Sequence, residues 1–512
     1  MQEGRAKKSL RNSVAGLTNS FLAIGFNFVK RTVFVHVLGA EYLGINGLFT
    51  NILAFLTLAD LGLTTAMAYS YYKPLAQNDK NKIAALNRCY RKIYNIIALA
   101  IAVIGLGLTP FLKFIVNTKN PVPDVYFYGS YFLLLAQTVV TYLFVYKGTL
   151  ITADQRQYLV TRVKTLTSLL CTVLEIIILL LTKNYLLYLS VALVTNIVNN
   201  LTISHFANKL FPYIRHSKEK LDKEEEKSIF SNIKSVFIYR LSGVLINSTD
   251  NLLISKIVGT VYVGYYSNYL IVINQLTSLI NICFRSLTAS LGNVLVTQTK
   301  EKQHEIFNTM QVASVWFGTV IASSVYLVIN DFIFAWLGQD YMLDGLTVFA
   351  IMLNFYLLCI LQPIWIFREA SGLYMQIKYV MVITAVINIV LSIILGMWIG
   401  LAGILLASAI AKLLTYMWYE PILLFRKYFS ANPWSFFKKL LLNFGGTCLL
   451  TGPLQFALSF IKFDNLWLLF FVRGFVAFAA LNAVYLIVYH KNEYFLGILN
   501  RLKNIFLKRK KA

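Results

Sequence analysis

Charged residues are scarce in this chain, at 13% of 512 residues, whereas apolar residues make up 58%. Soluble domains carry about 25% charged residues, so a soluble fold is excluded. Acidic residues are the scarcer charge, with 22 Asp and Glu against 47 Lys and Arg. The net charge of +25 would suit nucleic acid, but no nucleic-acid-binding module is present. Basic loops that face an anionic membrane leaflet explain this charge better.

Reactive side chains are also few. The five Cys show no metal or redox spacing and are interpreted as packing residues. The five His are dispersed, mostly at helix ends or in loops, and form no convergent catalytic set. No Walker A loop occurs, so ATP bound to this chain cannot drive its activity. The basic start leads into a full-length span without a cleavage site, so we expect no cleaved signal peptide. We expect no enzyme activity, no metal and no cofactor.

Long apolar stretches occupy most of the chain. A helix that crosses a bilayer needs about 20 mainly apolar residues, and fourteen stretches meet that need. We place them at 12–38, 43–70, 84–110, 125–146, 158–181, 185–206, 229–256, 260–294, 305–330, 343–367, 375–396, 400–425, 438–460 and 466–490. The sequence therefore predicts an all-α polytopic membrane protein with 14 transmembrane helices.

The basic residues alternate between the two sides of these spans. Of the 47 Lys and Arg, 36 lie at the chain ends or in the even-numbered connections and their flanks, and seven lie inside spans. Those on the odd-numbered side are Lys113, Lys119, Lys183 and Lys462. The positive-inside rule then predicts that both termini lie in the cytoplasm.

An internal repeat relates the two halves of the chain. A shift of 220 residues pairs Asn27 with Asn247, Gly39 with Gly259, Tyr42 with Tyr262 and Gly44 with Gly264. Six spans is an even number, so the two copies have the same orientation, as in many transporters. We predict an N-lobe at 1–210, a cytoplasmic linker at 211–228, a C-lobe at 229–427, and helices 13 and 14 with a basic tail at 428–512.

Polar stripes follow the first two spans of each repeat. A helix that faces lipid cannot carry such a stripe, because unpaired polar groups in hydrocarbon cost several kcal/mol. The stripes must face each other or water, so we expect a hydrated cavity between the two halves. The asparagines that we expect to line it are Asn27, Asn46, Asn247, Asn274 and Asn281.

Charges inside the spans are functional hypotheses, because a charge near the bilayer centre costs at least about 2.5–3.5 kcal/mol. Four cations would form a ladder across the cavity, suited to a phosphate or pyrophosphate. They are Lys30, Arg31, Arg240 and Arg285. The alternative is that these cations pair with the few intramembrane acids and hold the halves together.

Other intramembrane charges have two possible roles. Asp60 and Asp250 suit either a coupling Na⁺ or proton or charge pairing. Glu175 sits alone on an otherwise apolar stretch, and no partner is evident from the sequence. Lys412 lies mid-span and is open to the same two interpretations, whereas Arg473 is expected to snorkel or to pair locally.

Five short segments resemble a known family. They are Leu38–Phe49, Leu58–Gly62, Tyr72–Ala76, Ala153–Tyr158 and the stretch from Asp250 to Tyr266. They resemble the polysaccharide transporter (Wzx-type oligosaccharide flippase) family of the multidrug/oligosaccharidyl-lipid/polysaccharide (MOP) exporter superfamily. The resemblance implies two six-helix lobes around a central cavity that opens alternately to each side. It also implies that an undecaprenyl-pyrophosphate-linked oligosaccharide is moved from the inner to the outer leaflet of a bacterial cytoplasmic membrane.

The resemblance carries expectations for residues and partners. In the related lipid II flippases an essential arginine stands nine residues before the equivalent of Gly39, where this chain has Lys30. Arg31 stands where those proteins have an acid, and Asp60 lies in the second span, where they carry arginine. The implied partners are the lipid-linked glycan, membrane lipids, and a polymerase and glycosyltransferases of polysaccharide assembly, but no nucleic acid.

Two other functions stay open. A multidrug exporter of the same fold would favour acids in its cavity to bind cationic drugs, whereas these spans hold more bases than acids. A scaffold of a polysaccharide assembly complex that transports nothing has no need of a wet interior. Both fit the polar stripes less well than a flippase does.

The charge alternation predicts the topology of the chain. We expect reporter fusions at Lys119 and Asp340 to read outside, and fusions at Lys220 and Lys300 to read inside, because the basic connections stay in the cytoplasm. Paired alkaline phosphatase and fluorescent protein fusions measure this. An outside reading at Lys220 would contradict both the span count and the repeat.

Overall fold

The chain is all-helical in the residues that its computed structural model describes, which are 5–57, 63–116, 122–154, 156–215, 249–285, 298–371, 373–500 and isolated positions between them. No strand occurs in these ranges. The predicted all-α class is therefore confirmed. The chain divides into two compact units, unit 1 (Met1–Gly264) and unit 2 (Tyr265–Ala512).

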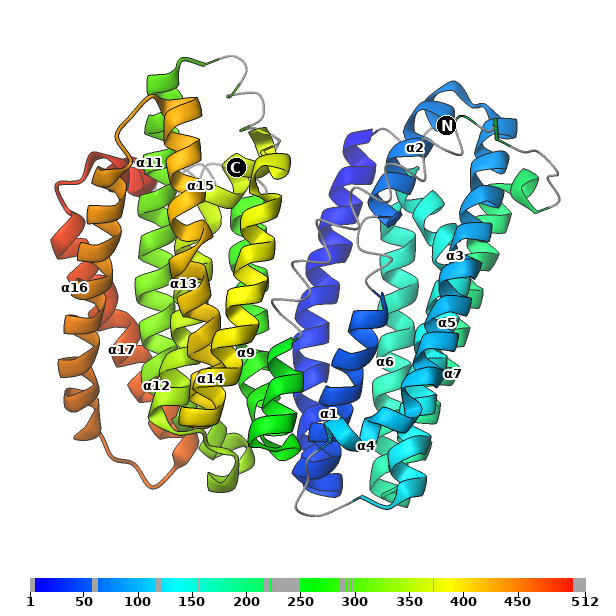
Figure 1. The fold of residues 1–512 in the computed structure, drawn as a ribbon, viewed down its shortest axis with the longest axis horizontal. Helices are drawn as coiled ribbons and strands as arrows, with labels where there is room; N and C mark the ends of the chain where they lie inside the picture. The colour runs from blue at the N-terminus through cyan, green and yellow to red at the C-terminus, as the bar shows by residue number, and fades with distance from the viewer. Residues whose placement is uncertain are drawn as a thin grey trace. The chain divides into compact units, whose positions relative to one another are not determined.

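The helices of unit 1 are long and follow the predicted spans closely. They are α1 (Arg5–Leu56), α2 (Leu63–Gln77), α3 (Lys80–Leu108), the short α4 (Leu112–Ile115), α5 (Asp124–Ala153), α6 (Gln157–Thr182) and α7 (Tyr185–Leu210), with 3₁₀ turns η2 (Thr109–Phe111) and η3 (Pro212–Ile214) and a π-helical turn η4 (Ile254–Val258). Pairs in contact are α1 with α6, α6 with α7, α7 with α5 and α5 with α3. Figure 1 shows α3, α5, α6 and α7 running side by side.

Tyrosines dominate the core of unit 1. Tyr90, Tyr94 and Tyr131 are fully buried, and each hydroxyl has a partner on another segment. Tyr90 meets Ser70 at 2.7 Å, Tyr94 meets Thr64 at 3.1 Å, and the Tyr131 hydroxyl donates to a backbone carbonyl of α3 at 2.8 Å. Helices in lipid gain little from the hydrophobic effect, so such interhelical hydrogen bonds add to their association.

The paired glycines of the repeat lie at one tight crossing inside unit 1. Gly39 bends α1 with φ +86°, and Gly259 has φ +135°, a region that favours glycine. A Cβ on Gly44 would overlap the Thr260 carbonyl, and a Cβ on Gly264 would lie 2.9 Å from the carbonyl oxygen of Ala40. The two corners therefore pack backbone against backbone, which explains why both copies carry glycine at these positions.

The same crossing bears on the segment that follows the charged linker. The segment 249–264 belongs to unit 1. Ser255 Oγ donates to the carbonyl of Ile115 at 3.1 Å, and Lys256 Nζ donates to that of Phe114 at 2.8 Å. Backbone contact at the glycines and these two bonds hold the segment on unit 1. The predicted six-helix lobes stay a prediction.

The helices of unit 2 begin with α9 (Thr260–Arg285), whose first turn lies in unit 1. The others are α11 (Lys300–Phe317), α12 (Ser323–Leu337), α13 (Gly345–Ser371), α14 (Tyr374–Leu414), α15 (Tyr416–Leu424), α16 (Trp434–Ser459) and α17 (Leu466–Tyr489), with π-helical turns η5 (Gly318–Ala322) and η7 (Phe425–Phe429) and a 3₁₀ turn η6 (Gln339–Tyr341). Within this unit, α12 packs on α17, α13 on α14 and α11 on α13.

The described helices are long and apolar enough for a multi-pass membrane protein. Nine of them, counted with their continuations, meet the length and hydropathy of a span within the described residues. Two expected pairs of spans are each separated by a non-helical glycine, Gly39 within α1 and Gly400 (φ +64°) within α14. The chain folds back on itself within α14, since the hydroxyls of Thr384 and Thr415 lie 2.7 Å apart. Large apolar side chains stay exposed along α3 and α17, among them Leu99 and Phe475. Such faces are suited to lipid.

The glycine crossing generates a prediction. We expect Gly44→Ala to lower the free energy of unfolding by about 1–3 kcal/mol, because a new methyl group forces the two backbones apart. The thermal midpoint of the purified protein in detergent measures this. Gly107→Ala is the matched control, since the space around Gly107 is open, and its midpoint should stay unchanged or rise. Equal midpoints for the two variants would contradict the close crossing.

Candidate functional site

A buried ion pair joins two helices of unit 1. Lys30 Nζ on α1 lies 2.7 Å from Glu175 Oε2 on α6. The Glu175 side chain is 1% exposed, and that of Lys30 is 31% exposed. A carboxylate this deep in an apolar helix needs a cation, because taking it out of water unpaired is prohibitive. The structure thus supplies the partner of Glu175 that the sequence left open.

Aromatic rings form the wall beside this pair. The Lys30 ammonium lies 5.2 Å from the ring centroid of Tyr188 on α7, within cation–π range. Tyr188 packs edge-on against Phe34 at 5.3 Å, and Phe34 meets Tyr185 at 5.8 Å. Phe34 is one turn beyond Lys30 on the same helix, so the rings fix the face on which the lysine lies.

Arg31 and Asn27 continue the polar face of α1. Arg31 is half-buried, and Asn27 is exposed. Arg31 follows Lys30 directly, so the two cations lie at the same predicted membrane depth, about two turns below Gly39, on adjacent sides of the helix. Two cations at one depth suit an anion with more than one charged oxygen. The substrate-binding role of both residues stays a prediction.

The part of α1 beyond Gly39 lines a polar pocket with α5 and α7. Its volume is about 530 Å³. The polar residues that line it are Thr50, Thr57, Gln137, Thr138, Thr141 and Asn196. Asn196 Nδ2 donates to Thr141 Oγ1 at 3.0 Å, and the hydroxyl of Tyr142 donates to the Thr57 carbonyl at 3.0 Å. Asn46 is half-buried one turn before Thr50, whose hydroxyl donates to the Asn46 carbonyl at 2.7 Å.

Several predicted residues of unit 2 bind other polar side chains. Asn281 accepts a hydrogen bond from Gln362 at 3.1 Å, whereas Asn274 is exposed on α9. Lys412 Nζ lies 2.8 Å from Asn354 Oδ1, three residues before the break between α14 and α15. A neutral amide thus orients Lys412.

Arg473 pairs locally, one of its two expected roles. Its Nη1 lies 3.0 Å from both carboxylate oxygens of Asp331, and its Nη2 donates to the carbonyl of Ile461 at 2.9 Å. These contacts join α17 to α12 and to the turn before it. Arg473 therefore contributes to the packing of α17 in unit 2.

Four predicted site residues lie wholly or in part outside the described residues. Arg240, Asp60 and Asn247 lie outside the described residues, and so does the side chain of Arg285, the last residue of α9. Asp250 is described and is half-buried next to η4. The cation ladder across the two halves therefore stays a prediction.

Sequence reasoning missed the polar faces of α5 and α7. Gln137 and Thr141 are four residues apart on α5, and Asn196 and Asn200 are four apart on α7. Asn200 Nδ2 donates to Asn196 Oδ1 at 2.5 Å. This spacing within predicted spans was the available signal, since residues four apart share a helix face.

The Lys30–Glu175 pair generates a double-mutant prediction. We expect Glu175→Ala to destabilise the protein by about 3–5 kcal/mol, because it leaves a cation unpaired at depth, and Lys30→Ala/Glu175→Ala to recover part of that loss. Thermal unfolding of the four proteins of the cycle measures the coupling.

The matched control is the exposed pair Lys113–Asp124, at 2.9 Å with side chains 55% and 66% exposed. Its coupling should be at most about 1 kcal/mol. If the coupling between Lys30 and Glu175 were also at most about 1 kcal/mol, the pair would not be desolvated.

No known protein family and no curated protein matches the sequence. Several solved structures, however, match the structure of this chain. The chain is similar to the lipid II flippase MurJ in an inward closed conformation, with a TM-score of 0.70 and 12% identity over 94% of this chain and 99% of that chain. It is also similar to an inward-facing multidrug resistance MATE family transporter of the MOP superfamily, with a TM-score of 0.60 and 14% identity over 79% of this chain and 96% of that chain.

A third similar structure is a MOP superfamily transporter from Pyrococcus furiosus whose binding pocket is described as having reverse polarity. Its TM-score is 0.54, with 12% identity over 81% of this chain and 95% of that chain. At identities this low the similarity concerns the fold alone. The chain has the fold of the MOP-superfamily membrane transporters and flippases.

Proposed function

We propose that this protein is a flippase that moves an undecaprenyl-pyrophosphate-linked oligosaccharide from the inner to the outer leaflet of a bacterial cytoplasmic membrane. It does so by alternating access, for cell-surface polysaccharide synthesis. The pyrophosphate binds intramembrane cations, and the sugars contact polar and aromatic walls. The sequence has no Walker A loop, so the membrane potential or an ion gradient, rather than ATP bound to this chain, supplies the energy.

The observation that carries the proposal is the extent of the structural match. The lipid II flippase matches 94% of this chain, whereas the MATE transporter matches 79%. About a fifth of the chain thus has no counterpart in the multidrug transporter. The match to the lipid II flippase, in contrast, covers 94% of this chain and 99% of the flippase chain.

The chemistry of unit 1 supports the same substrate class. Lys30 and Arg31 place adjacent cations on a membrane helix, and Tyr188 lies beside them. Thr, Gln and Asn side chains line a pocket of about 530 Å³ in the same unit. Cations suit a pyrophosphate, and amide and hydroxyl groups suit the hydroxyls of sugars.

A multidrug exporter is the second candidate, and Glu175 is one of the intramembrane acids that it could use. A cationic drug needs an available carboxylate, but Glu175 is buried and holds Lys30 at 2.7 Å. The polar pocket also disfavours a scaffold that transports nothing, because a scaffold gains nothing from buried polar surface.

A reconstituted assay separates these candidates. The purified protein is placed in proteoliposomes with a fluorescent polyprenyl-pyrophosphate oligosaccharide, and flipping is read from dithionite quenching. A flippase raises the rate at which label reaches the opposite leaflet, and a cationic dye is not moved. Movement of the dye without the lipid-linked glycan would support the multidrug exporter, and movement of neither would support the scaffold.

The proposal predicts the effect of removing two intramembrane arginines. We expect Arg240→Ala or Arg285→Ala to abolish flipping at near-normal protein abundance, because a pyrophosphate needs paired cations in a low-dielectric cavity. The loss should be a few kcal/mol of substrate binding. Lysine should be tolerated only in part, since it offers a point charge in place of a planar fork.

The exposed Arg426 is the matched control, and Arg426→Ala should leave flipping unchanged. Normal flipping by the Arg240→Ala and Arg285→Ala variants would contradict the proposed roles. So would a failure due only to degradation, or a rescue of Arg240→Ala by Asp250→Asn, because these outcomes point to structural charge pairing.

A further inference from the structure

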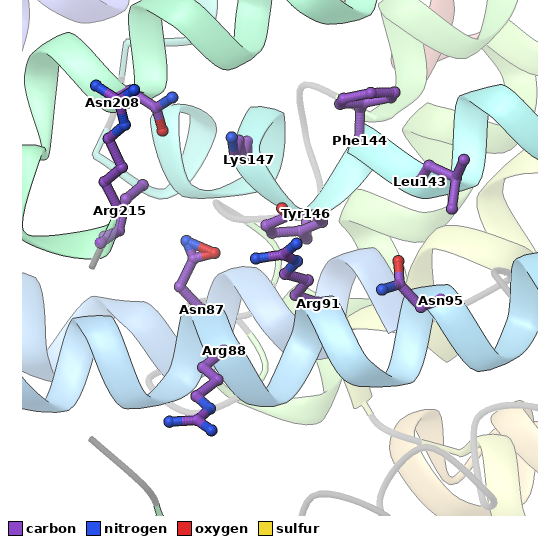
Figure 2. A pocket seen from close by; sticks show the side chains of 11 residues that line it. Asn87, Arg88, Arg91, Asn95, Leu143, Phe144, Tyr146, Lys147, Asn208 and Arg215 are labelled. Atoms are coloured by element: carbon purple, nitrogen blue, oxygen red, sulfur yellow. The ribbon is translucent and has the colours of Figure 1, made fainter. Parts of the chain in front are cut away.

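A basic pocket lies at one end of unit 1, apart from the residues discussed above. Its volume is about 720 Å³, and α3, α5, α7 and the turn η3 surround it (Figure 2). The residues that line it are Asn87, Arg88, Arg91, Asn95, Leu143, Phe144, Tyr146, Lys147, Asn208, Ile214 and Arg215. Four are cations and none is an acid.

Three of these cations come from three different elements. Figure 2 shows Arg91 pointing from α3 toward Lys147 on α5, with Arg215 beyond the end of η3, while Arg88 points away. Lys147 is close enough to Arg91 and Arg215 to be repelled by both. In the ranges that the structure describes, none of the three forms an ion pair with a carboxylate.

Neighbouring side chains hold Lys147 in place, whereas Arg91 and Arg215 are exposed. Lys147 Nζ lies 2.5 Å from Ser204 Oγ on α7, and its ammonium lies 6.0 Å from the centroid of the Tyr146 ring. Arg215 follows η3, which α3 and α7 both contact. Like charges fixed at close range cost free energy unless an anion neutralises them. A cluster of this kind differs from the scattered lysines of an ordinary basic loop.

The other residues that line the pocket indicate which groups the ligand carries besides its phosphate. The buried Asn208 Oδ1 has no hydrogen-bond partner in the described part of the chain, so it can accept a hydrogen bond from a ligand hydroxyl. Asn87 on α3 is buried and lines the same pocket. Leu143, Phe144 and Ile214 supply apolar surface. The site therefore offers cations, an amide acceptor and an apolar edge.

The pocket is at the end of unit 1 where basic residues are concentrated. Lys147 lies six residues, or about 9 Å, before the end of α5. Lys209 and Arg215 follow at the end of α7, and Lys80 and Lys82 begin α3. The positive-inside rule places this end in the cytoplasm, at the level of the inner-leaflet headgroups.

We propose that this pocket binds a phosphate ester that also carries hydroxyl groups. Arg91, Lys147 and Arg215 bind the phosphate, and Asn208 accepts a hydrogen bond from a hydroxyl. Two sources share this chemistry, an anionic lipid headgroup such as phosphatidylglycerol and a water-soluble phosphate such as glycerol 3-phosphate. The site is a binding site of unit 1 and does not depend on the proposed flipping activity.

Native mass spectrometry of the purified full-length protein tests the proposal. Short-chain phosphatidylglycerol, phosphatidylcholine and glycerol 3-phosphate are each titrated against the protein and against the variants Arg91→Gln, Lys147→Gln and Arg215→Gln. We expect selective binding of a hydroxyl-bearing phosphate over phosphatidylcholine, with roughly a ten- to hundredfold loss in each variant, the usual size for one hydrogen bond to a charged group.

Lys209→Gln is the matched control, because Lys209 is exposed in the last turn of α7 and does not line the pocket. It removes the same charge at the same end and should bind as the wild type does. Binding of glycerol 3-phosphate as tight as that of phosphatidylglycerol would assign the site to a soluble phosphate, and preference for the lipid would assign it to a headgroup. Either result supports the proposal.

Two results would overturn it. An equal loss in Lys209→Gln would reduce the binding to general surface charge. Equal binding of phosphatidylcholine would remove the selectivity for an anion. Thermal midpoints without ligand should match among the variants, which separates lost binding from lost folding.

Discussion

Hydrocarbon offers no hydrogen bonds, so a polar side chain at membrane depth in this chain needs a partner within the protein, and a charged or long side chain finds it on another helix. This constraint explains much of unit 1. Glu175 on α6 binds Lys30 on α1, and the hydroxyls of Tyr90, Tyr94 and Tyr131 each reach a second segment. Each contact therefore identifies two segments that must lie next to each other. The polar residues thus specify the neighbours, and the apolar residues between them only require burial or lipid.

The same constraint made part of the fold predictable from the sequence. Apolar stretches of span length and the alternation of basic residues gave the all-helical class and the spans. The structure explains the repeated glycines by the conformation of the backbone and by close contacts between two backbone segments. Gly39 and Gly259 have positive φ values, and Gly44 and Gly264 sit where a Cβ would meet another backbone. Such positions accept only glycine, so they are visible in a single sequence.

Other features were not predictable, because they depend on which helices meet. The contact of α1 with α6 joins segments far apart in sequence, so Glu175 had no evident partner. The polar faces of α5 and α7 were hidden for a different reason. The hydroxyl of Thr141 donates to the carbonyl of Gln137 one turn earlier, at 2.9 Å. A threonine whose hydroxyl is hydrogen-bonded within its own helix fits an apolar helix and a polar pocket equally well.

The Lys30–Glu175 pair also bears on how the chain is made. Lys30 enters the membrane with the first helix, whereas Glu175 arrives four predicted spans later. At roughly 5–20 residues per second, synthesis of the intervening chain takes on the order of ten seconds. During that time the ammonium has no carboxylate, and a helix with an unpaired charge is poorly stable in lipid. The first helix therefore reaches its full stability in the bilayer only after α6 has been made.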